Sequence, residues 1–521
     1  MRNSIALATF IVAFGFILSR FLGVIRQVVI TSAFGMENAE LAAFFVAFRI
    51  PDLLFQLLAG ATLSSALIPV LSKTWTTEGS SAAWRLASSI LNILFFVTLV
   101  MSILCFVFTP ALIPVIAPGL EDMGVKDICV RLTRIMLITP IIFCISGITT
   151  GILNGREHFL MPAIAPCVYN LGIIAAGIFL VDRYGVESLS YGVIAGASLH
   201  LAVQIPALFR KGFRWSPDLR FNDLGVRKIF SLAGPRMIGL AATQINTLVI
   251  ILFASLISVE AINVITISIM VMMLPVGIAG MSLGTVFFPA LVARVSAGEV
   301  AEYRSDLFLA VRATLWIASP LCLGLFLLSD GIVELIFEYG AFDSYATKTV
   351  AQVVQILALA GFSYSLVEIL SRGFYALSDT KTPVFVAVLS MCANLFLASL
   401  VIGLWGGDVE SLVWVIVTSA MFEFVILAVL LQRRAKFLQP RYFAMPAMGI
   451  IFGLIALGIS VSAVESLLSE IVLTLKIPSL VVIGGMIYTL VTSVFDADLR
   501  RRMLYQVFRS IPGAGKFSRK S

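Results

Sequence analysis

Long apolar runs separated by short polar segments recur along the whole chain. A helix needs about 20 apolar residues to cross the hydrocarbon core of a bilayer. Fourteen such runs cover residues 5–34, 40–71, 86–113, 128–152, 160–181, 187–209, 228–257, 261–292, 308–329, 346–371, 384–404, 411–432, 442–463 and 477–495. Because the short alternating strands of an outer-membrane barrel are absent from this pattern, it predicts an all-α polytopic membrane protein of about 14 transmembrane helices.

The composition agrees with this fold class. Of the 521 residues, 60% are hydrophobic and 12% are charged, whereas a soluble globular protein carries about 25% charged residues. The six cysteines are scattered without a CxxC pair, the two histidines form no metal-ligand cluster, and the sequence has no phosphate-binding GxxxxGK[ST] loop. We therefore expect no bound metal or cofactor, and any transport would draw on an ion gradient, the membrane potential or the substrate's own gradient.

The basic residues predict the orientation of the chain in the membrane. If the N-terminus is placed inside, 26 of the 36 lysines and arginines lie in inner segments, five lie in outer segments and five lie within the spans. Such an excess of inner positive charge predicts that both termini are cytoplasmic. The net charge of +7 is then membrane-surface charge, and it does not indicate a nucleic-acid partner.

An internal repeat divides the spans into two sets. Residues 60–71 (GATLSSALIPVL) match residues 280–291 (GMSLGTVFFPAL), at an offset of 220. An even number of spans separates the copies, which predicts two six-helix lobes related by a pseudo-two-fold axis along the membrane normal. Chance coincidence of Gly and Pro in apolar sequence is the alternative. The predicted organisation is an N-lobe (1–210), a basic cytoplasmic linker (211–227), a C-lobe (228–436), an appendage of spans 13 and 14 (437–495) and a basic cytoplasmic tail (496–521).

Candidate chemistry begins with arginines inside the spans. Arg20 and Arg26 both lie in the first apolar run, where a cation costs roughly 2.5–3.5 kcal/mol on insertion scales and normally faces water, a partner or a ligand. Arg49 lies in the second run. Three arginines with bidentate geometry suit a phosphate or diphosphate. The alternative is that their side chains snorkel to an interface.

Three acidic residues complete the intramembrane set. Asp52 lies one helical turn after Arg49 and could neutralise one of the arginines. Glu368 and Glu423, in the predicted C-lobe, are candidate ligands for an ion or a proton. No nucleophile and base can be paired from the sequence, so an enzymatic function is not expected.

Four motifs resemble those of a known family. They are SRFLGVIR at 19–26, AFFVAFRIPDLL at 43–54, IPVL at 68–71 and DTKTPV at 379–384. They are similar to motifs of the MurJ (MviN) lipid II flippases, members of the multidrug/oligosaccharidyl-lipid/polysaccharide exporter superfamily. The resemblance implies a bacterial plasma-membrane protein that moves the undecaprenyl-diphosphate-linked peptidoglycan precursor to the outer leaflet by alternating access.

The same resemblance suggests roles for particular segments. Arg20 and Arg26 match the family's span-1 arginines, and Arg49 matches a commonly basic position of span 2. Spans 13 and 14 would form a groove for the lipid tail. The implied partners are lipid II or a related polyprenyl-diphosphate glycolipid, membrane lipids and cell-wall synthesis proteins.

Span 8 departs from the family pattern. Ile269, Met270 and Met273 precede Pro275, where the family commonly carries an Asp-Arg pair and a Glu. With less charge in the second lobe, Arg20, Arg26 and Arg49 would supply most of the attraction for a diphosphate. This departure keeps one alternative within transport open: a flippase for another polyprenyl-diphosphate-linked glycan or an ion-coupled exporter. A non-transporting scaffold of a wall-synthesis complex is an alternative of another class, and the insertion cost of the in-membrane arginines argues against it.

Overall fold

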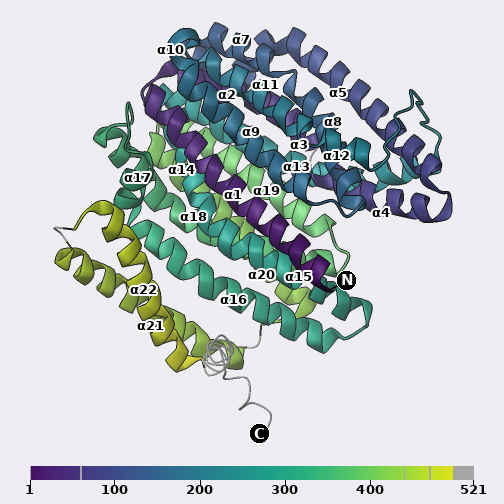
Figure 1. Ribbon diagram of the computed structural model, residues 1–521. Helices are drawn as coiled ribbons and strands as arrows, with labels where there is room; N and C mark the ends of the chain where they lie inside the picture. Colours follow the sequence, from purple (N-terminus) through teal and green to yellow (C-terminus); the bar gives the residue numbers. More distant parts are fainter. Residues whose placement is uncertain (1, 59–60, 439, 469–470, 497–521) are drawn as a thin grey trace. The chain divides into compact units, whose positions relative to one another are not determined.

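The computed structural model describes residues 2–58, 61–438, 440–468 and 471–496. All regular elements in these ranges are helices (Figure 1). Thirteen helical segments in the described ranges are long and apolar enough to span a membrane, and a shorter apolar helix covers Thr243–Ile257. The all-α polytopic fold with about 14 spans is therefore confirmed. The predicted basic tail, apart from Asp496, lies outside the described residues.

The chain divides into two compact units, of which the first comprises Met1–Ile267, Phe337–Thr347 and Met391–Val415. Its helices are α1 (Arg2–Phe34), α2 (Ala39–Ala47), α3 (Arg49–Leu58), α4 (Ala61–Thr77), α5 (Ser80–Ile116), α6 (Gly119–Asp122), α7 (Lys126–Met136), α8 (Thr139–Gly155), α9 (Leu160–Phe179), α10 (Val181–Tyr184), α11 (Glu187–Ala202), α12 (Ile205–Arg210) and α13 (Leu224–Ile257), with the π-helical η2 (Ser399–Leu404).

The predicted run 40–71 is divided into α2, α3 and α4. Asn38 caps α2, because its Oδ1 accepts hydrogen bonds from the backbone N–H groups of Glu40 (2.8 Å) and Leu41 (3.0 Å). Pro51 lies in the first turn of α3, where its missing N–H costs no intrahelical hydrogen bond. This proline therefore marks the start of a helix and not a bend within one.

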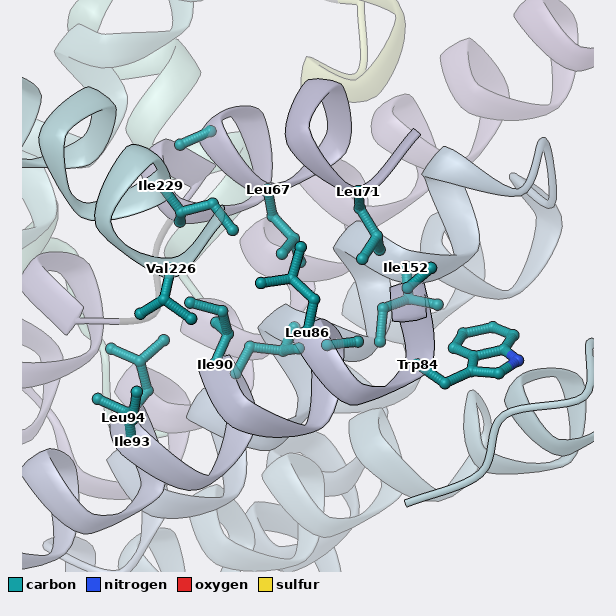
Figure 2. Packing of buried hydrophobic residues seen from close by; sticks show 14 of the residues in the cluster. Leu67, Leu71, Trp84, Leu86, Ile90, Ile93, Leu94, Ile152, Val226 and Ile229 are labelled. Carbon is teal, nitrogen blue, oxygen red and sulfur yellow. The ribbon is translucent and has the colours of Figure 1, made fainter. Parts of the chain in front are cut away.

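The core of the first unit joins α4, α5, α8 and α13 (Figure 2). Leu67 and Ile90 are fully buried, and Ile152 and Ile229 lie in the same cluster. Because α13 is the first helix of the predicted C-lobe, its packing here does not follow the predicted lobe boundary at 211–227. That boundary stays a prediction from the repeat.

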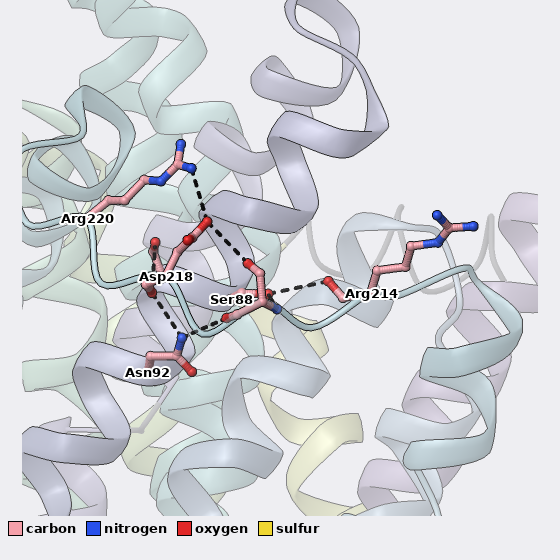
Figure 3. A network of polar contacts seen from close by, with 7 residues as sticks. Ser88, Asn92, Arg214, Asp218 and Arg220 are labelled. Atoms are coloured by element: carbon pink, nitrogen blue, oxygen red, sulfur yellow. Dashed lines mark hydrogen bonds and ion pairs between the residues drawn. The ribbon is translucent and has the colours of Figure 1, made fainter.

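The linker is held against α5 by hydrogen bonds to its backbone (Figure 3). Asn92 donates from Nδ2 to the carbonyls of Ser216 and Asp218, each at 2.9 Å, and accepts from Trp215 Nε1 at 3.0 Å. Ser88 Oγ accepts from the Ser216 backbone N–H at 3.1 Å. Side chains of α5 thus supply hydrogen-bond partners for backbone groups of a segment that has no regular secondary structure.

The second unit comprises Ser268–Ile336, Lys348–Ser390 and Ile416–Ser521. Helices α15 (Ser282–Ser296), α16 (Val300–Leu327), α21 (Pro440–Leu467) and α22 (Leu473–Phe495) belong to it, with the π-helical η1 (Val276–Met281). Residues of both units occur in α14 (Val259–Pro275), α17 (Ser329–Phe337), α18 (Ser344–Ala376), α19 (Lys381–Ala398) and α20 (Val409–Ala435). Figure 1 shows α21 and α22 side by side.

Asp379 lies between α18 and α19, outside the membrane-spanning helices. Its carboxylate accepts hydrogen bonds from the backbone N–H of Thr382 (3.0 Å) and from Thr382 Oγ1 (2.7 Å), and it pairs with Arg434. Burial alone would raise the pKa of Asp379, but these hydrogen bonds and the charge of Arg434 outweigh it and hold that pKa below its ordinary value.

Candidate functional site

The predicted cation Arg26 is positioned by the packing of α1 against α9 (Figure 1). The helices approach so closely that a Cβ on Gly15 would lie 2.8 Å from Ala163. At this contact Arg26 donates from Nη1 to Asn170 Oδ1 at 3.2 Å. Asn170 is itself oriented, because its Nδ2 donates to the Ser19 carbonyl at 3.2 Å.

Arg49 and Asp52 lie one turn apart on α3. Asp52 interacts electrostatically with both Arg49 and Arg26, and it accepts a hydrogen bond from Gln56. Tyr169, next to Asn170 on α9, lies within electrostatic range of Arg26 and Asp52. The structure therefore brings together two of the three predicted arginines and one of the three predicted acidic residues, and we name Arg26, Arg49 and Asp52 the N-lobe cluster.

The N-lobe cluster contains buried donors without acceptors. Arg26 Nε and Arg49 Nε are buried, and neither has a hydrogen-bond partner among the residues that the structure describes. A buried donor left unpaired costs free energy, more so on a charged group. Two arginines and one aspartate also leave one positive charge in excess. An anion that accepted from these Nε–H groups would satisfy both the geometry and the charge.

Arg20 lies apart from the N-lobe cluster. Its side chain is exposed, and its guanidinium lies 5.1 Å from the centroid of the Phe16 ring. Six residues of α-helix correspond to about one and two-thirds turns, so Arg20 and Arg26 lie on different faces of α1. A role for Arg20 in binding stays a prediction.

Aromatic rings pack beside the N-lobe cluster. Phe143 of α8 lies 4.7 Å from Phe55, 5.2 Å from Tyr169 and 5.4 Å from His200, measured between ring centroids. His200 Nδ1 is hydrogen-bonded to Ser146 Oγ at 2.6 Å, which satisfies this intramembrane histidine within the protein. Apolar rings lower the local dielectric constant, and this strengthens the electrostatic interactions of the neighbouring arginines.

In the second unit, Glu368 forms an ion pair with Arg372 across one turn of α18, at 2.5 Å. Glu423 on α20 lies within electrostatic range of Glu368 and in contact with Ser390. The prediction of Glu368 and Glu423 as ion ligands is not tested by these contacts. They do place Glu368 in a charge pair with Arg372, which lies one residue beyond the predicted apolar run 346–371.

Sequence reasoning missed four polar residues of these sites: Gln56, Tyr169, Asn170 and Arg372. A signal existed for Asn170, since an amide within the apolar run 160–181 needs a partner inside the membrane. A signal for Arg372 did not exist, because the apolar run ends at residue 371 whereas α18 continues to Ala376.

The second unit also contains a mostly apolar pocket of about 230 Å³ between α15, α16, α21 and α22. Phe287, Trp316 and Ile450 are among its lining residues. At its polar end Arg312 and Asp496 form an ion pair in which both side chains are largely buried. A pocket of this kind can hold an acyl chain along its apolar walls.

The family model and the relatives found by sequence agree in one family. The family model described as Lipid II flippase MurJ matches residues 30–483. The chain is 30% identical to a "Probable lipid II flippase MurJ" of Buchnera aphidicola subsp. Acyrthosiphon pisum (strain APS), over 73% of this chain and 74% of that protein. It is also 30% identical to the "Lipid II flippase MurJ" of Burkholderia cenocepacia, over 71% of this chain and 73% of that protein.

A solved structure is similar in fold. It is described as "Lipid II flippase MurJ, inward closed conformation", and it aligns with a TM-score of 0.77 over 94% of this chain and 99% of that chain. The sequence identity in this alignment is 22%, so the likeness is one of fold.

Proposed function

The chain belongs to the MurJ family of lipid II flippases, and we propose that it moves lipid II from the inner to the outer leaflet of the bacterial plasma membrane by alternating access. The observation that carries the proposal is the pair of buried Nε–H groups on Arg26 and Arg49, which have no hydrogen-bond partner in the described part of the chain. A diphosphate supplies the acceptor oxygens and the negative charge that these groups lack.

The N-lobe cluster binds the diphosphate in this proposal. Asp52 partly neutralises Arg26 and Arg49 while the site is empty, which lowers the cost of two buried cations. The diphosphate carries more negative charge than one carboxylate and accepts from several donors at once, so it replaces Asp52 as the main counter-charge. Arg20, which is exposed on α1 together with Arg26, attracts the anion as it approaches.

Release to the outer leaflet requires contacts inside the first unit to open. The Ala341 backbone N–H donates to the Ser32 carbonyl at 2.7 Å, and Asn263 Nδ2 donates to the Met36 carbonyl at 2.7 Å. With both termini cytoplasmic, as the distribution of basic residues favours, these contacts lie on the outer side of the membrane. They join segments 1–210 and 228–436, the two lobes that the repeat favours.

The pocket beside α21 and α22 receives part of the polyprenyl tail in this proposal. Its apolar lining, with Phe287, Trp316 and Ile450, suits a hydrocarbon chain. This gives the appendage of residues 437–495 a purpose outside the two repeated lobes. Proteins that supply or consume lipid II during wall synthesis are the expected partners.

The test is flipping of fluorescent lipid II in proteoliposomes that contain the purified full-length protein, with an Arg26→Ala/Arg49→Ala double variant beside it. We expect the wild type to flip and the double variant to lose flipping while it still folds and inserts into the membrane. Arg131→Ala is the matched control, because Arg131 is an exposed arginine outside the N-lobe cluster. Wild-type protein that inserts normally but moves no lipid II would refute the function, and an active double variant would refute the site.

The same assay separates the alternatives. If the protein flips another polyprenyl-diphosphate-linked glycan but does not flip lipid II, its substrate is that glycan. A protein that moves neither substrate in liposomes and also fails to rescue cells depleted of their own flippase would fit a scaffold.

A further inference from the structure

We propose that Arg372, in the second compact unit, is a further diphosphate-binding cation, and that Glu368 forms an ion pair with it until the substrate arrives. The inference rests on the proposed function, and it adds a binding residue outside the N-lobe cluster. The observations that carry it are the position of the Arg372 guanidinium against α15 and the partner that it holds.

A glycine makes room for the Arg372 guanidinium. A Cβ built on Gly284 of α15 would lie 2.3 Å from Nη1, 2.5 Å from Cζ and 2.6 Å from Nε of Arg372. The guanidinium therefore occupies the space that a side chain at position 284 would fill. One turn earlier, a Cβ on Gly280 would lie 2.9 Å from Ser365 Cα, so the two glycines bring α18 and its arginine close to the backbone of the repeated segment 280–291.

Glu368 accepts hydrogen bonds from only part of the Arg372 guanidinium. Nη1 donates to the Glu368 backbone carbonyl at 3.0 Å and to Glu368 Oε2 at 2.5 Å. A guanidinium has five N–H donors in a planar fork, and both of these hydrogen bonds use one nitrogen. The Arg372 side chain retains 21% of its accessible surface and that of Glu368 retains 33%, so an anion can reach the pair from solvent.

An acidic and a phenolic side chain lie near the Arg372–Glu368 pair. Tyr375 lies within electrostatic range of Arg372, Glu368 and Glu423, and Glu423 interacts with Glu368. A charge on Glu423 acts on Glu368 and on an incoming anion alike, so the exchange depends on the larger charge and the additional acceptor oxygens of the incoming anion. A diphosphate brings more charge and more acceptor oxygens, so it can take the arginine from a single carboxylate.

The depth of Arg372 suits an inner-leaflet headgroup. Arg372 lies four residues before the end of α18 at Ala376, about 6 Å along a helix axis. On the predicted topology this is the cytoplasmic end of span 10, close to where the diphosphate of an inner-leaflet lipid lies. Competition by Glu368 also limits the apparent affinity for the diphosphate. While Arg372 is paired with Glu368 it is not available to the diphosphate, and the apparent dissociation constant rises as the fraction of protein with an available Arg372 falls. Moderate affinity suits a transporter, which must release its substrate.

The experiment measures binding of undecaprenyl diphosphate to the full-length protein in neutral-lipid nanodiscs. Hydrogen bonds to charged groups are strong enough that losing them costs roughly tenfold or more in dissociation constant, so Arg372→Ala should weaken binding by about that factor. Glu368→Gln keeps the shape but removes the competing charge, and it should tighten binding several-fold. Gly284→Ala, which displaces the guanidinium but keeps the charge, should weaken binding, whereas Arg131→Ala should not change it.

The direction of the Glu368→Gln effect separates a substrate site from a structural ion pair. A purely structural pair would lose stability on this substitution without a gain in affinity, and that result would overturn the inference. Unchanged binding by a folded Arg372→Ala variant would also overturn it. If that variant does not fold, the Glu368→Gln result decides alone. Failure of the wild type to bind undecaprenyl diphosphate or to flip lipid II would instead count against the proposed function itself.

Discussion

Two glycines one turn apart should respond differently to the same added methyl group. In Gly280→Ala the new Cβ would lie 2.9 Å from Ser365 Cα, 3.0 Å from the Ser365 carbonyl oxygen and 3.1 Å from Glu368 Cβ. Two of these atoms belong to the backbone of α18, so the helices must separate. In Gly284→Ala the close atoms belong to the Arg372 guanidinium, the far end of a flexible side chain that can swing away.

The free energies follow from these contacts. Overpacking against backbone costs about 1–3 kcal/mol, while replacing a helical glycine by alanine returns roughly 0.5–1 kcal/mol. Gly280→Ala should therefore lower the free energy of unfolding by about 1–2 kcal/mol. Gly284→Ala loses only a partly exposed ion pair, worth about 0–1 kcal/mol, and this loss nearly cancels the same gain.

The assay is reversible denaturation of the purified protein in mixed micelles, followed by circular dichroism, for the wild type and both variants. The expected order is a clear loss for Gly280→Ala and little change for Gly284→Ala. An equal loss in both variants, or a larger loss for Gly284→Ala, would refute the argument that the neighbouring backbone decides the cost.

Three further perturbations test other parts of the structure. Asp379→Asn should remove a pH-dependent part of the stability, because the pKa of Asp379 is held below its ordinary value. The wild type has this stabilisation above about pH 4 and loses it as the pH falls through the lowered pKa, and acid titration of the unfolding midpoint would detect the loss. Asn92→Ala removes three hydrogen bonds to the linker, so it should cost about 1–3 kcal/mol and speed tryptic cleavage within 211–223; an unchanged cleavage rate would contradict this role. Gly340→Ala should speed amide hydrogen exchange in the 338–343 loop, because Gly340 has φ +61° and its Cβ would lie 2.5 Å from the Ser32 carbonyl oxygen; unchanged exchange would show that the loop tolerates the substitution.

The sequence pattern predicts the helices well because membrane insertion depends on local composition. A run of about 20 apolar residues must form a helix in the bilayer, since its backbone polar groups have no other partners there. The run 86–113 becomes α5 and the run 477–495 falls within α22. The pattern is less informative at 40–71, where the chain forms three helices, because Pro51 lies in the first turn of a new helix within a single apolar run.

The candidate site is only partly predictable, because position along one helix does not determine which residues meet. Arg26 and Arg49 are identified by their cost in an apolar run, and Asp52 by its spacing from Arg49. Their assembly into one cluster with Asn170 depends on the close approach of α1 and α9, which involves residues more than 140 positions apart.

By itself, the amino-acid sequence determined the class of the protein, the number of its spans and the types of charge that the membrane must accommodate. These properties follow from composition over about 20 residues, where transfer free energy is additive. The tertiary structure alone decided which charges are neighbours. It left the Nε groups of Arg26 and Arg49 buried without acceptors among the described residues, and it placed the Arg372 guanidinium over Gly284, because side-chain contacts depend on helix rotation and on how closely two backbones can approach.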